Sequence, residues 1–331
     1  MATIKEIAQK VGVSSSAVSR VLNYDKTISV NEETRNAIFR VAEEIGYKKK
    51  IVYPKIDDVA LLFWVANEEE LEDMYYKSIL DEMIAQAKWR NVQLEVIHKK
   101  DGIDKIPKST KAFIGIGWFS KKEIQYLHNI TEQGIFVDVS PDESMYDSVR
   151  PNLDSMVTQI VDRFVEKGYK NIAFVGNYDY NIDTCERAMD VREWSFRESA
   201  KYYELLNEEN IYIANALTVK EGYRIGKKII QKGKERLPQA ICVATDTLSV
   251  GLLQAFQEEE IAVPKHVAMF SINDIQLAQY VSPPLTTFHI DIPIMCESAL
   301  ELLQERMIKK RDITKTVYIN GRPVFRKSFL P

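Results

Sequence analysis

Cysteine is scarce in this sequence, with three residues among 331, and long apolar runs are missing. Cys185, Cys242 and Cys296 lie far apart and match neither a metal-binding nor a redox spacing, so we interpret them as reduced, buried thiols. No uninterrupted apolar stretch approaches the ~20 residues that a membrane-spanning helix needs. The first ten residues are polar and amphipathic, unlike a signal peptide. These absences predict a cytoplasmic protein that does not bind a membrane.

Sequence patterns typical of catalysis are also missing. The chain has four histidines, none in a recognisable catalytic motif, and it contains no Walker loop and no GxGxxG or GxSxG sequence. An enzyme would need a positioned acid–base pair or a nucleophile. We therefore predict a protein that is not an enzyme and that uses no cofactor or metal.

Residues 1–50 differ in charge from the rest of the chain. They hold nine Lys or Arg against six Asp or Glu, a net of +3, while the whole chain has a net charge of −4 and the remainder therefore carries −7. A basic segment at one end of an acidic protein indicates a nucleic-acid-binding module.

Three short helices are predicted in this basic segment. Thr3 begins a capping box at the start of the first helix, which stops at Gly12. Ser14 then caps a second helix from 15 to about 22, and a third amphipathic helix follows over 32–45. Two short helices joined by a glycine turn are the pattern of a helix-turn-helix unit.

Three consecutive serines stand at the start of the second helix, although serine is a mediocre helix former. In a helix-turn-helix unit, the first residues of that helix face base edges in the major groove. Small hydroxyl side chains allow a close approach and can donate to or accept from either strand. We therefore predict that Ser15 and Ser16 contact bases and that Arg20 contacts guanine or phosphate. The alternative is that the serines only cap the helix.

The sequence T-I-K-E-I-A-x-x-x-G-V-S-x-x-A-V-S-R-V-L-N, followed by S-V-N-E-E-T-R and A-E-E-I-G-Y, resembles the headpiece of the lactose-repressor family of bacterial regulators. The resemblance implies a homodimer that binds a near-palindromic, double-stranded operator DNA. The implied major-groove contacts come from Ser14, Ser15, Ser16, Ser19 and Arg20. The implied contacts with the DNA backbone come from Thr3, Asn23, Asn31 and Tyr47.

The family follows its headpiece with a hinge helix that places a leucine in the minor groove. Residues 51–58 here are expected to form a shorter linker, which lacks the family's Ala-Arg-x-Leu sequence. Pro54 argues against a helix in this linker. Lys48, Lys49 and Lys50 are expected to touch phosphates, and the alternative is a solvated linker.

Beyond the linker, short apolar stretches alternate with amphipathic ones. Strands are expected at 59–65, 93–97, 112–116, 135–139, 172–175, 211–214, 240–244 and 267–271. Helices are expected at 78–89, 153–167, 191–208, 222–231 and 247–260. Repeated strand–helix units in a body of this length predict two α/β lobes with parallel sheets. We place the first lobe at about 59–150 and 292–316 and the second at 151–289 and 317–331, with 285–291 crossing between them.

Four stretches of the body resemble the sugar-binding, periplasmic-binding-protein-like core of the same family: V-E-K-G-Y-K-N-I-A-F-V-G, A-T-D-T-L-S-V-G-L-L-Q-A-F, V-P-K-H-V-A-M-F-S-I-N-D and P-P-L-T-T-F. The expected fold is therefore a small all-α helix-turn-helix headpiece joined to a two-lobed α/β core. Ligands of such cores lie at the carboxyl ends of the strands, so polar residues that follow strands are binding candidates.

Eight residues are candidates for contact with a sugar effector. Arg192 lies in R-E-W-S-F, where the family has R-x-x-G-F and its arginine typically grips sugar hydroxyls; the alternative is a surface ion pair. Asn273 and Asp274 stand where the family shows two aspartates. Trp64 and Tyr76 are expected to stack on an apolar sugar face, while Trp64 alternatively belongs to the core. The remaining candidates end predicted strands: Asp138, Thr245 and Asp246. For both Asp246 and Asp274, helix capping is the alternative role.

The acidic run E-E-E-L-E-D-M-Y-Y at 68–76 is by itself typical of a solvated loop and a helix start. Together with S-I-N-D and V-R-E-W-S-F, it resembles the family branch that contains repressors of the evolved β-galactosidase and galactose operons. This resemblance implies a nucleoid-associated repressor of galactoside utilisation that a galactoside relieves. The open alternatives are another sugar or a corepressor and, outside regulation, a sugar-binding protein or a sugar enzyme. The chain lacks the leucine heptads of a tetramerising tail, so a dimer is expected, with a tetramer formed through another surface as the alternative.

Overall fold

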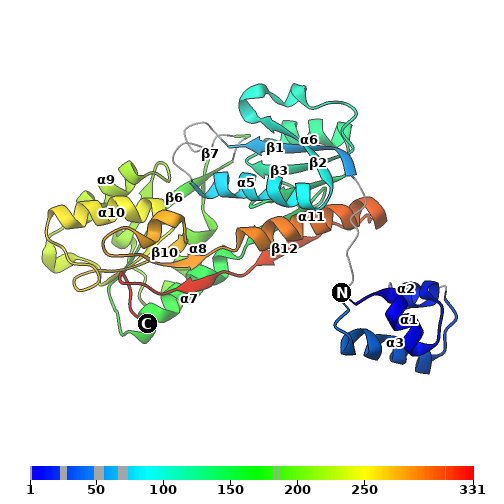
Figure 1. Cartoon of the computed structure of the whole chain (residues 1–331). Helices are drawn as coiled ribbons and strands as arrows, with labels where there is room; N and C mark the ends of the chain where they lie inside the picture. The colour runs from blue at the N-terminus through cyan, green and yellow to red at the C-terminus, as the bar shows by residue number, and fades with distance from the viewer. Residues whose placement is uncertain are drawn as a thin grey trace. The chain divides into compact units, whose positions relative to one another are not determined.

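The computed structural model describes residues 2–22, 28–47, 56–65, 74–181, 183–184, 186–309 and 311–331. The chain divides into two compact units, Met1–Pro54 and Lys55–Pro331 (Figure 1). Strand β1 (Ile56–Trp64) begins inside the linker that was predicted over 51–58, so the end of that stretch belongs to a sheet. The rest of the predicted linker and the three lysines before it lie outside the described residues.

The first unit holds three helices, α1 (Ile4–Val11), α2 (Ser15–Leu22) and α3 (Glu32–Glu44). Thr3 caps α1 within a capping box, and Asn31 caps α3. Gly12 ends α1 with a φ of 76°, a left-handed conformation that glycine adopts without strain. The three helices enclose a small apolar core whose most deeply buried side chains are Ile7, Val18, Val21 and Ile38.

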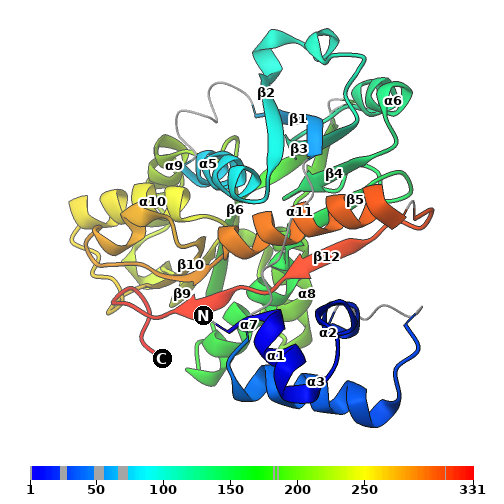
Figure 2. The ribbon, with the colours of Figure 1, turned by 45° about the vertical axis from the view of Figure 1, so that its right-hand side comes forward.

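The second unit contains two α/β lobes. The first lobe has a six-stranded parallel sheet in the order β12-β5-β4-β3-β1-β2. The strands that join β1 are β2 (Val92–His98), β3 (Ala112–Gly117), β4 (Gly134–Val137), β5 (Asp147–Pro151) and β12 (Thr316–Ile319). Helices α5 (Met74–Trp89) and α11 (Ile292–Lys309) lie side by side over one face, as Figure 2 shows, and α6 (Lys121–Ile130) covers the other.

Strand β1 shows why this sheet is apolar on both faces. Leu61 and Phe63 point toward α5 and α11, whereas Leu62 and Trp64 point toward α6. Successive side chains of a strand alternate between the faces of the sheet. Because helices cover both faces of a parallel sheet, its central strands are continuously apolar instead of alternating with polar residues.

The second lobe has a sheet in the order β13-β11-β10-β9-β6, with β7 and β8 also paired to β6. Its strands are β6 (Ile172–Asn181), β7 (Glu186–Met189), β8 (Ile211–Ala214), β9 (Ala240–Val243), β10 (Ala268–Asn273), β11 (Thr286–His289) and β13 (Arg322–Val324). Its helices are α7 (Leu153–Glu166), α8 (Val191–Tyr202), α9 (Val219–Ile230) and α10 (Asp246–Glu258). Helices α7 and α8 pack on one face of the sheet, and α9 and α10 pack on the other.

The chain crosses between the lobes after β5, β11 and β12. One predicted lobe boundary is wrong, and one predicted crossing is too long. Residues 286–289 form β11 within the second sheet, so the crossing predicted over 285–291 follows His289. Strand β12 pairs with β5 in the first sheet, so the change of lobe predicted between 316 and 317 follows Ile319. These short, partly polar strands join their sheets through backbone hydrogen bonds, which a side-chain pattern does not reveal.

A buried ion cluster ties the end of α11 and the start of β12 to β5. The Asp147 carboxylate accepts from Arg306 at 3.3 Å and from Arg311 at 3.1 and 2.5 Å. The Lys315 backbone N–H donates to it at 2.7 Å. Because a buried carboxylate is tolerated when it is paired and hydrogen-bonded, the charged stretch D-S-V-R-P forms an inner strand of the sheet.

Three further observations concern the class of protein. Cys242 and Cys296 are buried free thiols, as predicted, while Cys185 lies outside the described residues. In the described part of the chain, no helix is both long and apolar enough to cross a membrane. Across the same residues, no three or more His, Cys, Asp or Glu side chains gather where they would hold a metal ion.

Candidate functional site

The start of α2 exposes the serines that were predicted to read bases. Ser14, Ser15, Ser16 and Arg20 are exposed, and Ser19 is half-buried. Ser14 Oγ accepts a backbone N–H of the first turn at 3.1 Å and lies 2.9 Å from Ser16 Oγ. Ser14 therefore caps the helix. The cap fixes the helix start, and base contact by the exposed hydroxyls of Ser15 and Ser16 stays a prediction.

The residues predicted to contact the DNA backbone include two helix caps. Thr3 Oγ1 and Asn31 Oδ1 each accept the backbone N–H three residues further on, at 3.3 and 2.8 Å. A hydroxyl that accepts can also donate, and the Asn31 amide has a separate NH₂ group, so neither cap excludes a phosphate contact. Tyr47 follows α3 and is half-buried. Asn23 lies outside the described residues.

A cavity of about 390 Å³ lies between the two lobes, at the carboxyl ends of strands from both sheets. Strand ends supply much of its wall: Trp118 follows β3, Asp138 follows β4 and Thr245 follows β9. Five of the eight predicted effector residues line this cleft: Tyr76, Asp138, Arg192, Thr245 and Asn273. Asp138, Thr245 and Asn273 lie at strand ends, where ligands of parallel sheets bind, whereas Tyr76 and Arg192 come from the first turns of α5 and α8.

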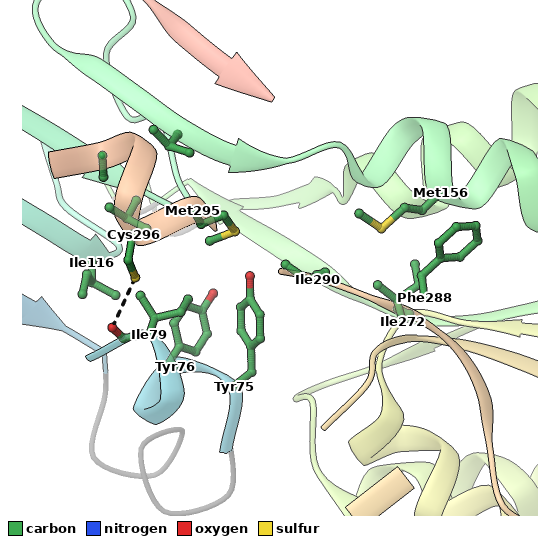
Figure 3. Close-up of a cluster of buried hydrophobic side chains, with 14 of the residues drawn as sticks. Tyr75, Tyr76, Ile79, Ile116, Met156, Ile272, Phe288, Ile290, Met295 and Cys296 are labelled. Carbon is green, nitrogen blue, oxygen red and sulfur yellow. Dashed lines mark hydrogen bonds between the residues drawn. The ribbon is translucent and has the colours of Figure 1, made fainter. Parts of the chain in front are cut away.

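Two tyrosines hold the Asp138 carboxylate. Tyr75 Oη donates to Oδ1 at 2.7 Å, and Tyr76 Oη donates to Oδ2 at 2.9 Å. Figure 3 shows the two rings leaving the start of α5 next to each other, with Ile290 on the far side of Tyr75. Burial raises the pKa of Asp138 above its ordinary value, against the opposing effect of the two hydroxyls. Because each carboxylate oxygen has two lone-pair sites, Asp138 can also accept from a ligand hydroxyl.

Arg192 is 9% exposed, and its side chain is held by Asp190, the residue that caps α8. Its Nε donates to Asp190 Oδ1 at 2.8 Å and its Nη2 donates to Oδ2 at 2.7 Å. Further bonds run from Nη1 to the Ala244 carbonyl at 3.1 Å and from Nη2 to Asn177 Oδ1 at 3.3 Å. Among the described residues, these bonds engage four of the five N–H groups. Arg192 is thus a buried, ion-paired side chain, and the described residues do not engage its second Nη1 N–H.

The Asp190–Arg192 pair stays charged although it is buried. Burial alone would raise the pKa of Asp190, but the neighbouring guanidinium holds it below its ordinary value. Burial would likewise lower the pKa of Arg192, but the Asp190 carboxylate raises it. The cleft carries charges of both signs on its wall: Asp138, Asp179, Asp183 and Asp190, against Lys121, Arg150 and Arg192. This balance offers both acceptors and donors without a net positive field.

Trp64 is a core residue and does not line the cleft, so the predicted stacking role is wrong. Its side chain is 1% exposed and stacks on Phe119, with ring centroids 5.3 Å apart. Its Nε1 donates to Glu123 Oε1 at 2.7 Å. Trp64 is the last residue of β1, but successive side chains of a strand alternate between the two faces of the sheet, and the Trp64 ring packs on the face that α6 covers.

Asp246 is fully buried and does not face the cleft. Its carboxylate accepts from the hydroxyls of Ser271 and Thr287 and from the Ile275 backbone N–H. Burial raises the pKa of Asp246 to about 7. The alternative role, in which Asp246 caps the next helix, is also wrong, because the N-cap of α10 is Thr245.

Asp274 also lies away from the main cleft. It accepts from Arg326 Nη2 at 2.7 Å, and its other oxygen lies 3.0 Å from His289 Nδ1. Its side chain borders a smaller cavity of about 230 Å³. Its neighbour Asn273 lines both cavities, and a sugar contact by Asn273 stays a prediction.

Several residues of the cleft were missed by the sequence analysis. Trp118 and Asn177 follow two predicted strands, and the rule applied to the other candidates would have found them. Asp190 precedes a predicted helix, where a cap was the only local signal. Asp179 and Asp183 line the cleft from the β6–β7 hairpin, which has no signal in the apolar pattern.

Comparison with known proteins supports the same division of the chain. Residues 3–50 match the family described as bacterial regulatory proteins, lacI family, and residues 161–329 match the periplasmic binding protein-like domain. The HTH-type transcriptional regulator GanR of Bacillus subtilis (strain 168) is 44% identical over 328 residues, 99% of each chain. The regulator LacR of Lactobacillus helveticus is 34% identical over 334 residues, 100% of this chain and 99% of its own.

Among solved structures, the complex of the transcriptional regulator CelR with cellobiose has the same fold. It superposes with a TM-score of 0.70 at 18% identity and covers 99% of this chain and 100% of its own. The full-length match to GanR and the head match over residues 3–50 establish the family. Bacterial regulators of this kind act on chromosomal DNA in the cytoplasm. The chain belongs to the lacI family of bacterial regulatory proteins and is a DNA-binding transcriptional regulator, not an enzyme.

Proposed function

We propose that this regulator is a nucleoid-associated repressor of galactoside utilisation, and that a galactoside bound between its two lobes releases it from its operator. The observation that carries the proposal is the Asp138 carboxylate, held by two tyrosines in a cleft that also contains the ion-paired Arg192. Hydroxyl groups of an uncharged sugar need such acceptors and donors together. An anionic ligand would instead favour a net positive wall, which the cleft residues do not supply.

An aromatic wall supports the sugar assignment. Trp118 is half-buried, lines the cleft, and packs edge-on against Tyr76 with ring centroids 5.2 Å apart. Aromatic rings bind the apolar face of a pyranose through burial of its C–H groups. Trp118 therefore takes the stacking role that the sequence analysis assigned to Trp64.

The repressor acts as a homodimer whose two heads bind the half-sites of a near-palindromic operator. Exposed apolar side chains on α5 and β2 support self-association: Trp89 is 70% exposed, Ile84 40% and Val96 37%. Ligand binding changes DNA affinity only if the sugar prefers one arrangement of the lobes over another. A cleft lined by both lobes provides that preference, because closure changes the contacts of a bound sugar.

A thermal-shift screen of the purified protein tests the effector. The compounds are galactose, lactose, allolactose, glucose, ribose, sucrose and a purine. At 100 times its dissociation constant, a ligand that binds the folded state stabilises it by about 2.7 kcal/mol, which is readily measured. We expect a shift with galactosides alone. A shift with another sugar or with the purine, or none with any galactoside, would contradict the galactoside assignment.

Replacing Ser16 by alanine tests base reading by the head. We expect the preferred base at one position of each half-site to change or relax, because a lost hydroxyl contact is worth about 1 kcal/mol, roughly fivefold in affinity. Binding to a randomised duplex pool, followed by sequencing, measures the preference. Ser109→Ala, an exposed serine outside the head, is the matched control. An equal loss of affinity across all sequences would count against base reading.

A further inference from the structure

A β-hairpin extends from the second lobe beyond the edge of its sheet. The inner part of β6 pairs in parallel with β8 and β9, up to Asn177. From Tyr178 onward, β6 pairs antiparallel with β7 instead. Figure 1 shows this hairpin leaving β6 toward the lobe that contains β1 and β3. All four positions of β7 are exposed, so the hairpin is not part of the core.

The hairpin contacts the opposite lobe. Asp183 Oδ1 accepts the backbone N–H of Lys121, the first residue of α6, at 2.9 Å. A carboxylate at this place is favourable because the first N–H groups of a helix have no partner within the helix and carry partial positive charge. Both residues also line the cleft, together with Asp179 and Tyr180 of the hairpin. The hairpin is thus a wall of the cleft and contacts the opposite lobe by a hydrogen bond, in addition to the three chain crossings.

Both sides of this contact are held in place. On the hairpin, the Arg187 guanidinium lies 4.5 Å from the centroid of the Tyr178 ring. On the first lobe, Ser120 and Glu123 form a capping box that fixes the start of α6. A saccharide chain that continues past Asp183 would have to push the hairpin away from α6. It would thereby break the hydrogen bond between the Asp183 carboxylate and the Lys121 N–H.

We propose that the β6–β7 hairpin is a specificity-determining wall that closes one end of the sugar cleft, so that the protein binds a short galactoside and rejects one that is extended at that end. The proposal rests on the galactoside function proposed above. Charge-assisted hydrogen bonds are worth about tenfold or more in an equilibrium constant. An extended sugar that breaks the Asp183–Lys121 bond therefore binds at least about tenfold more weakly than one that leaves it intact.

Isothermal titration calorimetry on the full-length protein tests this wall. The probes are lactose and two lactose derivatives, one extended by two galactose residues at its galactose end and the other extended at its glucose end. For the wild type, we expect at least one extended sugar to bind about tenfold or more weakly than lactose. In Asp183→Ala, that difference should shrink to about threefold or less. Asp183→Asn keeps an acceptor for the helix N–H and should restore most of the discrimination.

Asp104→Ala is the matched control, because Asp104 is an exposed aspartate that does not line the cleft. Its discrimination should equal that of the wild type. Circular dichroism tests whether each variant is folded. We expect the Asp183 variants to fold, because Asp183 is exposed and does not belong to the core. The proposed role of the hairpin is wrong if the wild type binds lactose and both extended sugars equally well. It is also wrong if Asp183→Ala discriminates between them as the wild type does. If the wild type binds no galactoside, both the proposed function and the proposed role of the hairpin are wrong.

Discussion

Replacing Arg192 by alanine should abolish the thermal shift with galactosides and lower the free energy of unfolding by about 3–5 kcal/mol. The loss of stability follows because Asp190 would keep its charge at a buried site without the guanidinium that now donates to both of its oxygens. The loss of ligand binding follows because the cleft would lose a cation and the anchor of Asn177. Urea denaturation and calorimetry measure the two effects separately.

The double variant Asp190→Ala/Arg192→Ala separates ligand binding from folding. Removing both partners leaves no buried unpaired charge, so this variant should be more stable than Arg192→Ala alone. It should still bind no galactoside. Because the head is a separate compact unit, both variants should bind operator DNA and no longer release it when galactoside is added. A full thermal shift in either variant would refute the role of Arg192 in the cleft.

Raising the pH from about 4 to about 8 should destabilise the wild type relative to Asp246→Asn by up to about 4 kcal/mol. Asp246 is 0% exposed, and burial raises its pKa from 3.8 in the unfolded chain to about 7 in the folded one. The folded state therefore holds the proton more tightly, so this contribution to stability is fully present below pH 4 and is lost as the pH rises through 7. The separation of the two values, at roughly 1.4 kcal/mol per pH unit, gives the magnitude.

Urea denaturation at pH 4, 6 and 8 measures this difference. Asparagine is neutral at every pH and can still accept one hydrogen bond while its amide donates to the hydroxyls of Ser271 and Thr287. The variant should therefore lose the pH dependence that belongs to this site. Asp104→Asn, at an exposed aspartate, should follow the wild-type profile. Parallel profiles for the wild type and Asp246→Asn would show that Asp246 is charged in the folded protein.

The headpiece is predictable from the sequence because its signals are local. Thr3 and Asn31 cap their helices through bonds to the backbone three residues away, and Gly12 takes the left-handed conformation that ends α1. Each of these helix ends is determined by residues within a few positions of it in the sequence. The apolar strands of the core are predictable for a similar reason, since continuous apolar runs such as that of β1 fit only a sheet covered on both faces.

Elements whose stability depends on distant partners were missed. Strand β5 contains the buried Asp147, which is tolerated only because Arg306 and Arg311 reach it from α11 and the segment that follows. Helix α11 itself has no single apolar face, because it packs both against α5 and against the sheet. Neither environment is visible in a stretch of sequence read alone.

The sequence by itself determined the family, the helix-turn-helix head, the two-lobed core and the strand ends where a ligand binds. It named Asp138, Thr245 and Asn273 for the cleft, since a residue at the carboxyl end of a parallel strand lies at that edge of the sheet. It named Tyr76 as an aromatic ring for stacking and Arg192 through the resemblance to the family. Only the tertiary structure decided that Trp64, Asp246 and Asp274 face other partners, and that Asp183 reaches the opposite lobe. The physical reason is that a local pattern fixes where a residue lies along an element, whereas the direction and partners of its side chain depend on the elements packed around it.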